Sequence, residues 1–234
     1  MADDNRPLKY MRYAIGEIVL VVVGILIALQ INTWNGKRKM KKEKNSVISS
    51  LMSDLVKDSA MIHNYDSILI KKEDLLLEYF RRMHHQSANL DTILRIAERE
   101  YSPDFDRIYN FNNSTFNSLE STGKFELFDD EMRKNILDLR QQQLEYLKKS
   151  EISHELFLMF TSNYGQNYKF LKDRDNSYLT NLVWRIDDER DFVQKFSNAI
   201  SIHSYVINTT RADNKSIMNQ TKNVLISLQN KSRE

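Results

Sequence analysis

The chain has 234 residues, enough for one membrane anchor and one further domain with a sizeable core. Its 34 basic and 32 acidic residues nearly balance, so its charge gives no support to nucleic acid as a partner. It has no cysteine, which excludes disulfides and thiolate metal sites, and its five glycines and two prolines point to long helices rather than sheets.

Residues 13–35, with the sequence YAIGEIVLVVVGILIALQINTWN, form the most apolar stretch of the chain. Every residue from Ile18 to Leu29 is apolar or glycine, and the whole stretch is about 33 Å long as a helix, enough to cross a bilayer. Tyr10, Tyr13 and Trp34 have the amphipathic rings that are enriched at membrane interfaces. The sequence therefore predicts a transmembrane helix over 13–35.

A cleaved signal peptide is the competing interpretation of this stretch, because residues 1–12 form a short basic tail ahead of it. The end of the stretch disfavours that interpretation. After Ala28 the chain continues with leucine and glutamine, without a pair of small residues at cleavage spacing, and a basic run follows. We expect the stretch to be retained as an anchor.

One face of the predicted span carries an acid and small residues. At about 100° per residue, Tyr10, Glu17, Gly24, Ala28 and Ile31 fall on the same side. Gly24 and Ala28 form a small-xxx-small pair, which lets membrane helices approach closely. Glu17 then lies at the edge of a helix-packing seam, or it reaches water from near the helix end, and both interpretations stay open. A proton relay is disfavoured, because Glu17 is not central and has no second acid in the span.

The anchor and the basic run after it resemble the N-terminal signature of a family of small single-span membrane proteins of Bacteroidota, known only as a domain of unknown function. This chain departs from the pattern at Thr33 and Gly36, where relatives commonly have asparagine and an acidic residue. A weaker similarity covers residues 114–136, STFNSLESTGKFELFDDEMRKNI. The resemblance implies a bacterial inner-membrane protein with no assigned activity, and it adds no catalytic residue.

A basic juxtamembrane run follows the span and consists of Lys37, Arg38, Lys39, Lys41, Lys42 and Lys44. It can bind anionic lipid head groups, or it is a solvated helix whose lysines reach water, and the second interpretation is favoured. Counted literally, this run favours a cytoplasmic domain. Long domains translocate largely regardless of flanking charge, and a short N-terminal tail usually stays inside. We therefore lean to an extracytoplasmic domain and leave the cytoplasmic side open.

Residues 36–234 are expected to form a soluble helical bundle. Apolar residues recur at helical spacing from Lys37 to about His85, at Ile48, Leu51, Leu55, Ile62, Leu69, Leu76, Phe80 and Met83. This pattern predicts a long stem, followed by a short helix over 90–101. Ser114 is expected to cap another short helix that Gly123 closes, Asp129 to cap a second long helix, and a third to run from about Asp187 to Leu228. The fold class is all-α, with one N-terminal transmembrane helix followed by a long-stem helical bundle.

The sequence shows no clear catalytic or metal site. Glu151 and His154 form one Glu-x-x-His pair, whereas di-iron bundles need two such pairs and further glutamates. His84 and His85 point about 100° apart on a helix, so they cannot share one ion. With no P-loop or nucleophile elbow, we expect no enzyme and no cofactor. The aromatic cluster of Tyr101, Phe105, Tyr109, Phe111 and Phe116 is expected to be core rather than a recognition surface.

The leading functional hypothesis is a membrane-anchored helical interaction or scaffold protein of the bacterial envelope. Its partners would be the lipid bilayer and, through Gly24 and Ala28, either a second copy or another membrane protein. The alternative is a sensor-like module in which the bundle binds a small ligand between its helices. The absence of a second apolar run of spanning length predicts a single pass.

Overall fold

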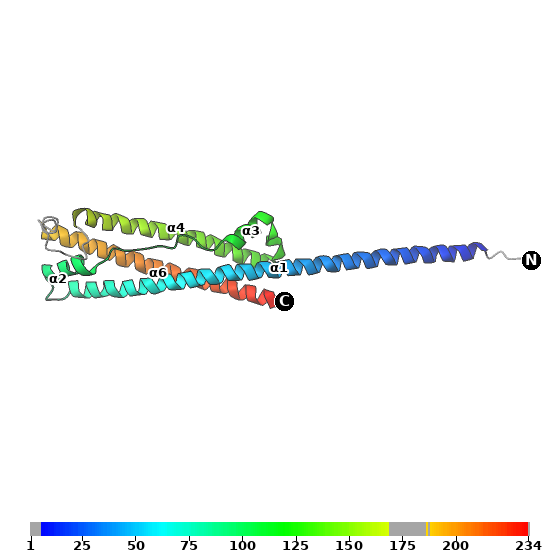
Figure 1. Cartoon of the computed structure of the whole chain (residues 1–234), viewed down its shortest axis with the longest axis horizontal. Helices are drawn as coiled ribbons and strands as arrows, with labels where there is room; N and C mark the ends of the chain where they lie inside the picture. Colours follow the sequence, from blue (N-terminus) through cyan, green and yellow to red (C-terminus); the bar gives the residue numbers. More distant parts are fainter. Residues whose placement is uncertain (1–5, 169–185, 187, 234) are drawn as a thin grey trace, which may run out of the picture.

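A single helix, α1, runs from Arg6 to Met83 and contains both the apolar stretch and the predicted stem. The structure is a computed structural model that describes residues 6–168, 186 and 188–233. Figure 1 shows α1 leaving one end of a helical bundle and continuing far beyond it. The helix continues through Gly36, although glycine costs about 1 kcal/mol in a helix interior. The apolar stretch and the stem of the bundle are therefore parts of one continuous helix.

Two further long helices complete the bundle: α6 (Glu189–Arg233) packs against the second half of α1, and α4 (Asp130–Asn167) packs against α6. Along α1, apolar residues seven apart face the core: Ile48, Leu55, Ile62, Leu69 and Leu76 are all buried. Burying each such side chain contributes about 1.5 to 3 kcal/mol. Within the described residues the fold is helical without strands, so the predicted all-α fold class is confirmed.

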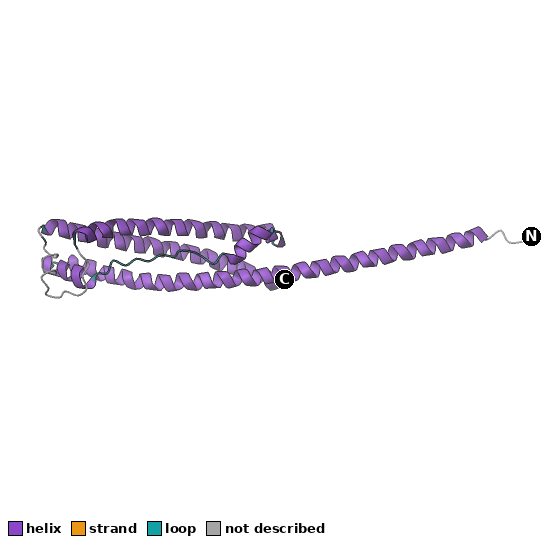
Figure 2. Ribbon diagram, turned by 45° about the horizontal axis from the view of Figure 1, so that its top comes forward, coloured by secondary structure: helices purple, strands orange, loops and turns teal. Residues whose placement is uncertain are grey.

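Between α1 and α4 the chain passes through five short segments. Helix α2 (Leu90–Arg95) begins after Asn89, whose side chain accepts a hydrogen bond from the Thr92 N–H, and it continues into the π-helical turn η1 (Ile96–Glu100). Residues 101–113 are extended, and we call them the strap. Helix α3 (Ser114–Thr122) and the 3₁₀ turn η2 (Lys124–Leu127) follow. Figure 2 shows the strap as a thin loop running along the bundle.

The capping residues predicted from the sequence are found in the structure, with one exception at the start of α3. Gly123 closes α3 in the left-handed conformation, with φ of 69°, as predicted. The Asp129 side chain accepts a hydrogen bond from the Met132 N–H, which caps α4 as predicted and lowers the pKa of that carboxyl. Ser114 was expected to cap α3, but it is the first helical residue. An acid from α1 satisfies that helix end instead, as described below.

Helix α6 differs from its prediction at both ends. Its expected start, Asp187, lies outside the described residues, and the helix is described from Glu189. It continues past the predicted end at Leu228 to Arg233, because Leu228 is fully buried and the last turn still packs at the end of the bundle where α1 emerges.

Candidate functional site

The apolar half of α1 stands free of the bundle. In its most apolar window no residue is buried inside the structure, and among the described residues this is the one helix long and apolar enough to cross a membrane. Tyr13 and Trp34 are 73% and 65% exposed at its two ends. The Arg38 guanidinium lies 5.9 Å from the centre of the Trp34 ring. Tyr10 belongs to α1, but its side chain lies outside the described part.

The predicted seam lies on the part of α1 that extends beyond the bundle. Ala28 is on the Gly24 side, and the exposed Glu17 is also on that side. A Cβ added at Gly24 would have no atom within 4 Å. The three seam residues are exposed, like the rest of the apolar stretch, so the structure does not distinguish this side from the others.

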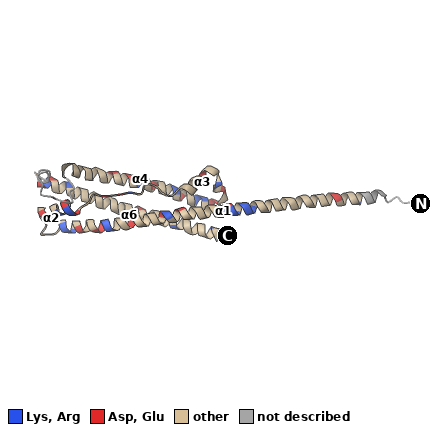
Figure 3. Cartoon of the chain, in the orientation of Figure 1, with Lys and Arg blue, Asp and Glu red and all other residues tan. Residues whose placement is uncertain are grey.

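The basic juxtamembrane run lies where α1 enters the bundle. Figure 3 shows a blue stretch of the α1 ribbon, which marks lysine and arginine residues, at that point. Lys37, Arg38, Lys39, Lys41 and Lys42 are exposed, and Lys44 is half-buried. Two ion pairs close this end of the bundle: the Lys124 Nζ lies 2.8 Å from Glu43, and the Lys231 Nζ lies 3.1 Å from Asp129.

A row of polar side chains on α1, which we call the polar ladder, holds the strap. The members farthest from the apolar half of α1 are Tyr65, Lys72 and Tyr79, which are spaced seven residues apart. Their side chains donate to backbone oxygens: Tyr65 to Asp106 at 2.5 Å, Lys72 to Asp104 at 2.5 Å and Tyr79 to Glu100 at 3.0 Å. These three side chains therefore bond two backbone oxygens of the strap and that of the last residue of η1.

Two buried aspartates continue the polar ladder toward the apolar half of α1. Asp58 accepts hydrogen bonds from the backbone N–H and side-chain amide of Asn112, at 2.8 and 2.7 Å, and from the Gln143 amide at 3.2 Å. Asp54 accepts from the backbone N–H and hydroxyl of Thr115, at 3.2 and 2.7 Å. Burial raises the pKa of Asp58, although the Asn112 hydrogen bonds oppose this. Asp54 thus provides from α1 the cap of α3 that the sequence analysis assigned to Ser114.

The strap also contributes apolar side chains to the core. Phe105 packs against Phe157 of α4 with ring centres 5.5 Å apart, and Phe111 packs against Tyr146 at the same distance. The strap is therefore bonded to α1 and packed against α4, and it occupies the position of a fourth helix. Of the predicted aromatic cluster, Tyr101, Phe105 and Phe111 are buried, Phe116 is half-buried and Tyr109 is exposed.

A polar layer crosses the middle of the bundle. The buried Asn214 of α6 accepts a hydrogen bond from the Tyr146 hydroxyl at 2.6 Å and donates to Asp66 of α1 at 3.2 Å. Arg211 forms an ion pair with Glu73 and lies 3.6 Å from Asp66. Since each partner comes from a different helix, this layer favours one register of the three helices over others.

His203 of α6 is buried within an aromatic cluster. Its ring centre lies 4.7 Å from that of Phe157 and 5.8 Å from that of Tyr101, and its Nδ1 is 3.2 Å from the Tyr101 hydroxyl. Burial, together with the positive charge of Lys72, lowers the pKa of His203 to about 4. His203 is therefore neutral over the physiological range.

The other histidines with described contacts are bound to neighbours. His154 stacks on Phe105 with ring centres 6.2 Å apart, and Glu151 lies 3.5 Å from Arg107. The His84 ring contacts the Phe80 carbonyl, and the His85 ring contacts Ser87. Within residues 6–168, 186 and 188–233, no group of three or more metal-binding side chains was found.

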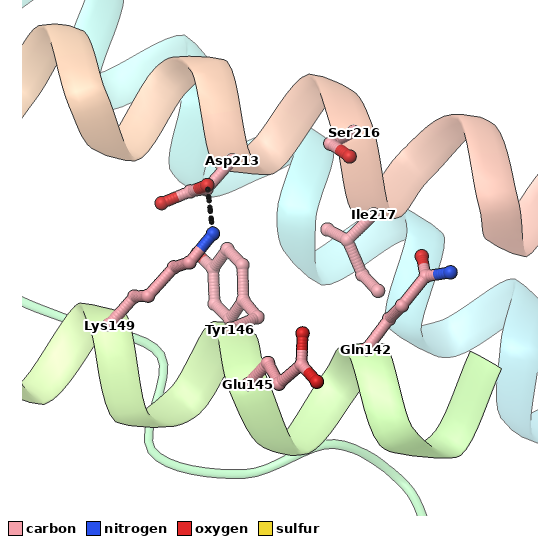
Figure 4. Close-up of a pocket in the computed structure, with 7 residues that line it drawn as sticks. All are labelled: Gln142, Glu145, Tyr146, Lys149, Asp213, Ser216 and Ile217. Atoms are coloured by element: carbon pink, nitrogen blue, oxygen red, sulfur yellow. Dashed lines mark hydrogen bonds and ion pairs between the residues drawn. The ribbon is translucent and has the colours of Figure 1, made fainter. Parts of the chain in front are cut away.

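One hollow lies between α4 and α6, where a small ligand could bind between two helices. It has a volume of about 220 Å³ and is lined by Gln142, Glu145, Tyr146, Lys149, Asp213, Ser216 and Ile217. Figure 4 shows the Lys149 ammonium, 3.4 Å from Asp213, across this hollow. Ligand sites usually enclose about 300 to 1,000 Å³, so this hollow is small for a ligand, whereas a hollow of about 540 Å³ beside Met52 and Val56 of α1 is within that range.

The sequence analysis missed the polar ladder, although a signal for it exists. On α1 the positions 55, 62, 69 and 76 are apolar, and the positions three residues later are Asp58, Tyr65, Lys72 and Tyr79. Both rows repeat every seven residues, so a polar row accompanies the apolar row on the core side. Such a row indicates that α1 packs there against something other than an ordinary helix.

Comparison with known proteins gives one match. Residues 17–91 match the model of a family of unknown function, DUF6090. The match begins at Glu17 and ends at Asp91, so it covers most of α1 and the start of α2 and leaves the weaker similarity over 114–136 without support. No curated protein and no solved structure matches the chain. The anchor and stem of this chain are similar to a protein family to which no function is assigned.

Proposed function

We propose that this chain is a membrane-anchored helical interaction protein that spans a bilayer once through residues 13–35 and associates there with another membrane helix. The observation that carries the proposal is the exposed stretch with Glu17, Gly24 and Ala28, which extends beyond the bundle on one continuous helix and has free space at Gly24. In lipid, apolar side chains gain nothing by leaving the bilayer for each other, so helices associate where small residues let their backbones approach. A second copy and a different membrane protein both fit this face.

The chemistry of the bundle supports a structural role. The two groups with the most unusual surroundings are Asp58 and His203, and both are buried and hydrogen-bonded inside the core. Perturbed groups mark catalytic sites when they line a cleft, whereas these hold the strap and fill the aromatic cluster. We infer that the bundle is a rigid body that the anchor holds at the membrane and that no reaction takes place in it.

The location in a bacterial inner membrane, with residues 36–234 on the extracytoplasmic side, is part of the same proposal. Alkaline phosphatase fused to the C-terminus is expected to be active, because the enzyme matures only outside the cytoplasm. A fluorescent protein fused at the same point, which reports a cytoplasmic location, is expected to stay dark. Bright fluorescence with an inactive phosphatase would place the bundle in the cytoplasm.

Substitutions in the seam test the interaction. Gly24→Leu and Ala28→Leu are expected to abolish association in the membrane, because a bulky side chain holds the two backbones apart. Glu17→Gln is expected to be milder, since an amide can still form a hydrogen bond across the interface. Val22→Leu is the matched control on the opposite side of α1 and is expected to have no effect.

The measurement is crosslinking or a two-hybrid readout in membranes, with expression and insertion checked for each variant. Equal loss of association in Val22→Leu and Gly24→Leu would show that the face has no special role. Glu17 would then be an interfacial acid that reaches water, and the proposed interaction would have to occur elsewhere.

A further inference from the structure

A hollow of about 280 Å³ lies at the end of the bundle from which the anchor emerges. Three lysines line it: Lys41 and Lys44 from α1 and Lys231 from the last turns of α6. Lys41 and Lys44 are close to each other along the chain. Lys231 is far from them in sequence, and the fold brings it to the same hollow. The structure therefore gathers cations from the two ends of the chain around one cavity.

The position of this hollow is close to the lipid surface. Its α1 residues, 40–45, lie 6 to 11 residues beyond Trp34, or about 9 to 16 Å along the helix. The polar layer of a bilayer adds about 5 to 8 Å on each side of the hydrocarbon. Side chains of a helix lean toward its N-terminus, so Lys41 and Lys44 lean back toward the membrane. Their ammonium groups therefore lie at the outer edge of the head groups.

The remaining lining suits a phospholipid better than a free anion. Met40, which is 58% exposed, and the half-buried Leu127 provide apolar surface beside the lysines. Asn45 adds an uncharged amide. The carboxylate of Glu126 also lines the hollow, and the Lys231 ammonium contacts Asp129 at 3.1 Å, so any bound anion shares that lysine. Lysine clusters at this depth attract anionic lipids with about 1 kcal/mol per side chain.

We propose that this hollow is a binding site for the phosphate of an anionic phospholipid from the adjacent leaflet, held by Lys41, Lys44 and Lys231. The apolar side chains of Met40 and Leu127 contact the glycerol part of the lipid. The site rests on the proposed membrane anchoring, but it does not depend on which side the bundle occupies or on the seam. Its occupation fixes the base of the bundle on the membrane surface.

The test uses the full chain in nanodiscs of phosphatidylcholine, with or without phosphatidylglycerol, and counts retained lipids by native mass spectrometry after gentle release in detergent. The variant is the triple Lys41→Gln, Lys44→Gln and Lys231→Gln. The control triple, Lys71→Gln, Lys148→Gln and Lys215→Gln, removes the same charge from exposed positions along the bundle. Circular dichroism confirms that each variant keeps its helices.

The wild type and the control are expected to retain phosphatidylglycerol in preference to phosphatidylcholine. At about fivefold per lysine, the site triple is expected to lose about tenfold or more in that preference, since Lys231 is already shared with Asp129. If the site triple does not fold, the salt dependence of wild-type binding decides, because added salt screens the charges of the lysines and is expected to release the phosphatidylglycerol.

Several outcomes would overturn the site. Equal retention in the wild type and the site triple, or an equal loss in the control triple, would show only general attraction to positive charge. Equal thermal stabilisation by inorganic phosphate would assign a free-anion site instead. A chain that does not enter nanodiscs at all would refute the anchoring itself, so the two failures are distinguishable.

Discussion

Acid is expected to destabilise the bundle through His203. In the unfolded chain this histidine binds a proton near its ordinary pKa of 6.5, whereas in the fold it does so only at about 4. Between these values the unfolded state binds more protons than the folded state, so stability falls as the pH falls. The stability that neutral His203 contributes is fully present above pH 6.5 and is lost progressively as the pH falls to about 4.

The gap between 6.5 and about 4 corresponds to about 3 kcal/mol at about 1.4 kcal/mol per pH unit. Between pH 7.5 and 5 the expected loss is about 2 kcal/mol, since the folded-state pKa has not yet been reached. For a chain of this size that loss lowers the melting temperature by about 4 to 8 °C. Asp58 acts in the opposite direction, because burial raises the pKa of its carboxyl group in the fold.

The assay is urea unfolding of the full chain in a mild non-ionic detergent, followed by circular dichroism at pH 7.5 and 5. The variant His203→Gln does not titrate, so subtracting its pH dependence from that of the wild type isolates His203. His84→Gln removes an exposed histidine and is expected to behave as the wild type. The same pH dependence in the wild type and in His203→Gln would refute the reasoning.

Three further predictions concern stability. Asp58→Ala leaves the donors of Asn112 and Gln143 without an acceptor and is expected to cost about 3 kcal/mol, with faster hydrogen exchange in the strap. Asp58→Asn, which keeps one acceptor oxygen and removes a buried charge, is expected to cost about 1 kcal/mol. Leu55→Ala and Leu69→Ala are each expected to cost about 2 to 5 kcal/mol by denaturant unfolding, because both leucines are buried. Gly123→Ala is expected to cost about 1 kcal/mol in the same assay, because alanine is strained at φ of 69°.

Apolar periodicity and capping residues were sufficient to predict the helices of this fold. The apolar row of α1, the cap at Asp129 and the left-handed Gly123 depend on short-range rules that a single sequence contains. The register of the core on α1 follows from the same row, and Leu55 and Leu69 are buried as expected.

The strap was not predicted, because its structure depends on groups far away in sequence. Residues 101–113 have no helical or strand periodicity of their own, and backbone groups of Asp104, Asp106 and Asn112 are bonded to side chains of α1. Asp54 caps α3 from 61 residues away in sequence, so no local rule identifies it. The hollow with Lys231 has the same origin, since the bundle joins the C-terminal turns to the juxtamembrane run.

The continuity of α1 has a mechanical consequence. From Trp34 to Met83 the helix is about 74 Å long, and neither proline nor a change of helix type interrupts it. If residues 13–35 span a bilayer as proposed, a tilt of about 20°, the average for spanning helices, displaces the far end sideways by about 25 Å. A change in membrane thickness that alters this tilt then moves the distal end of the bundle parallel to the membrane.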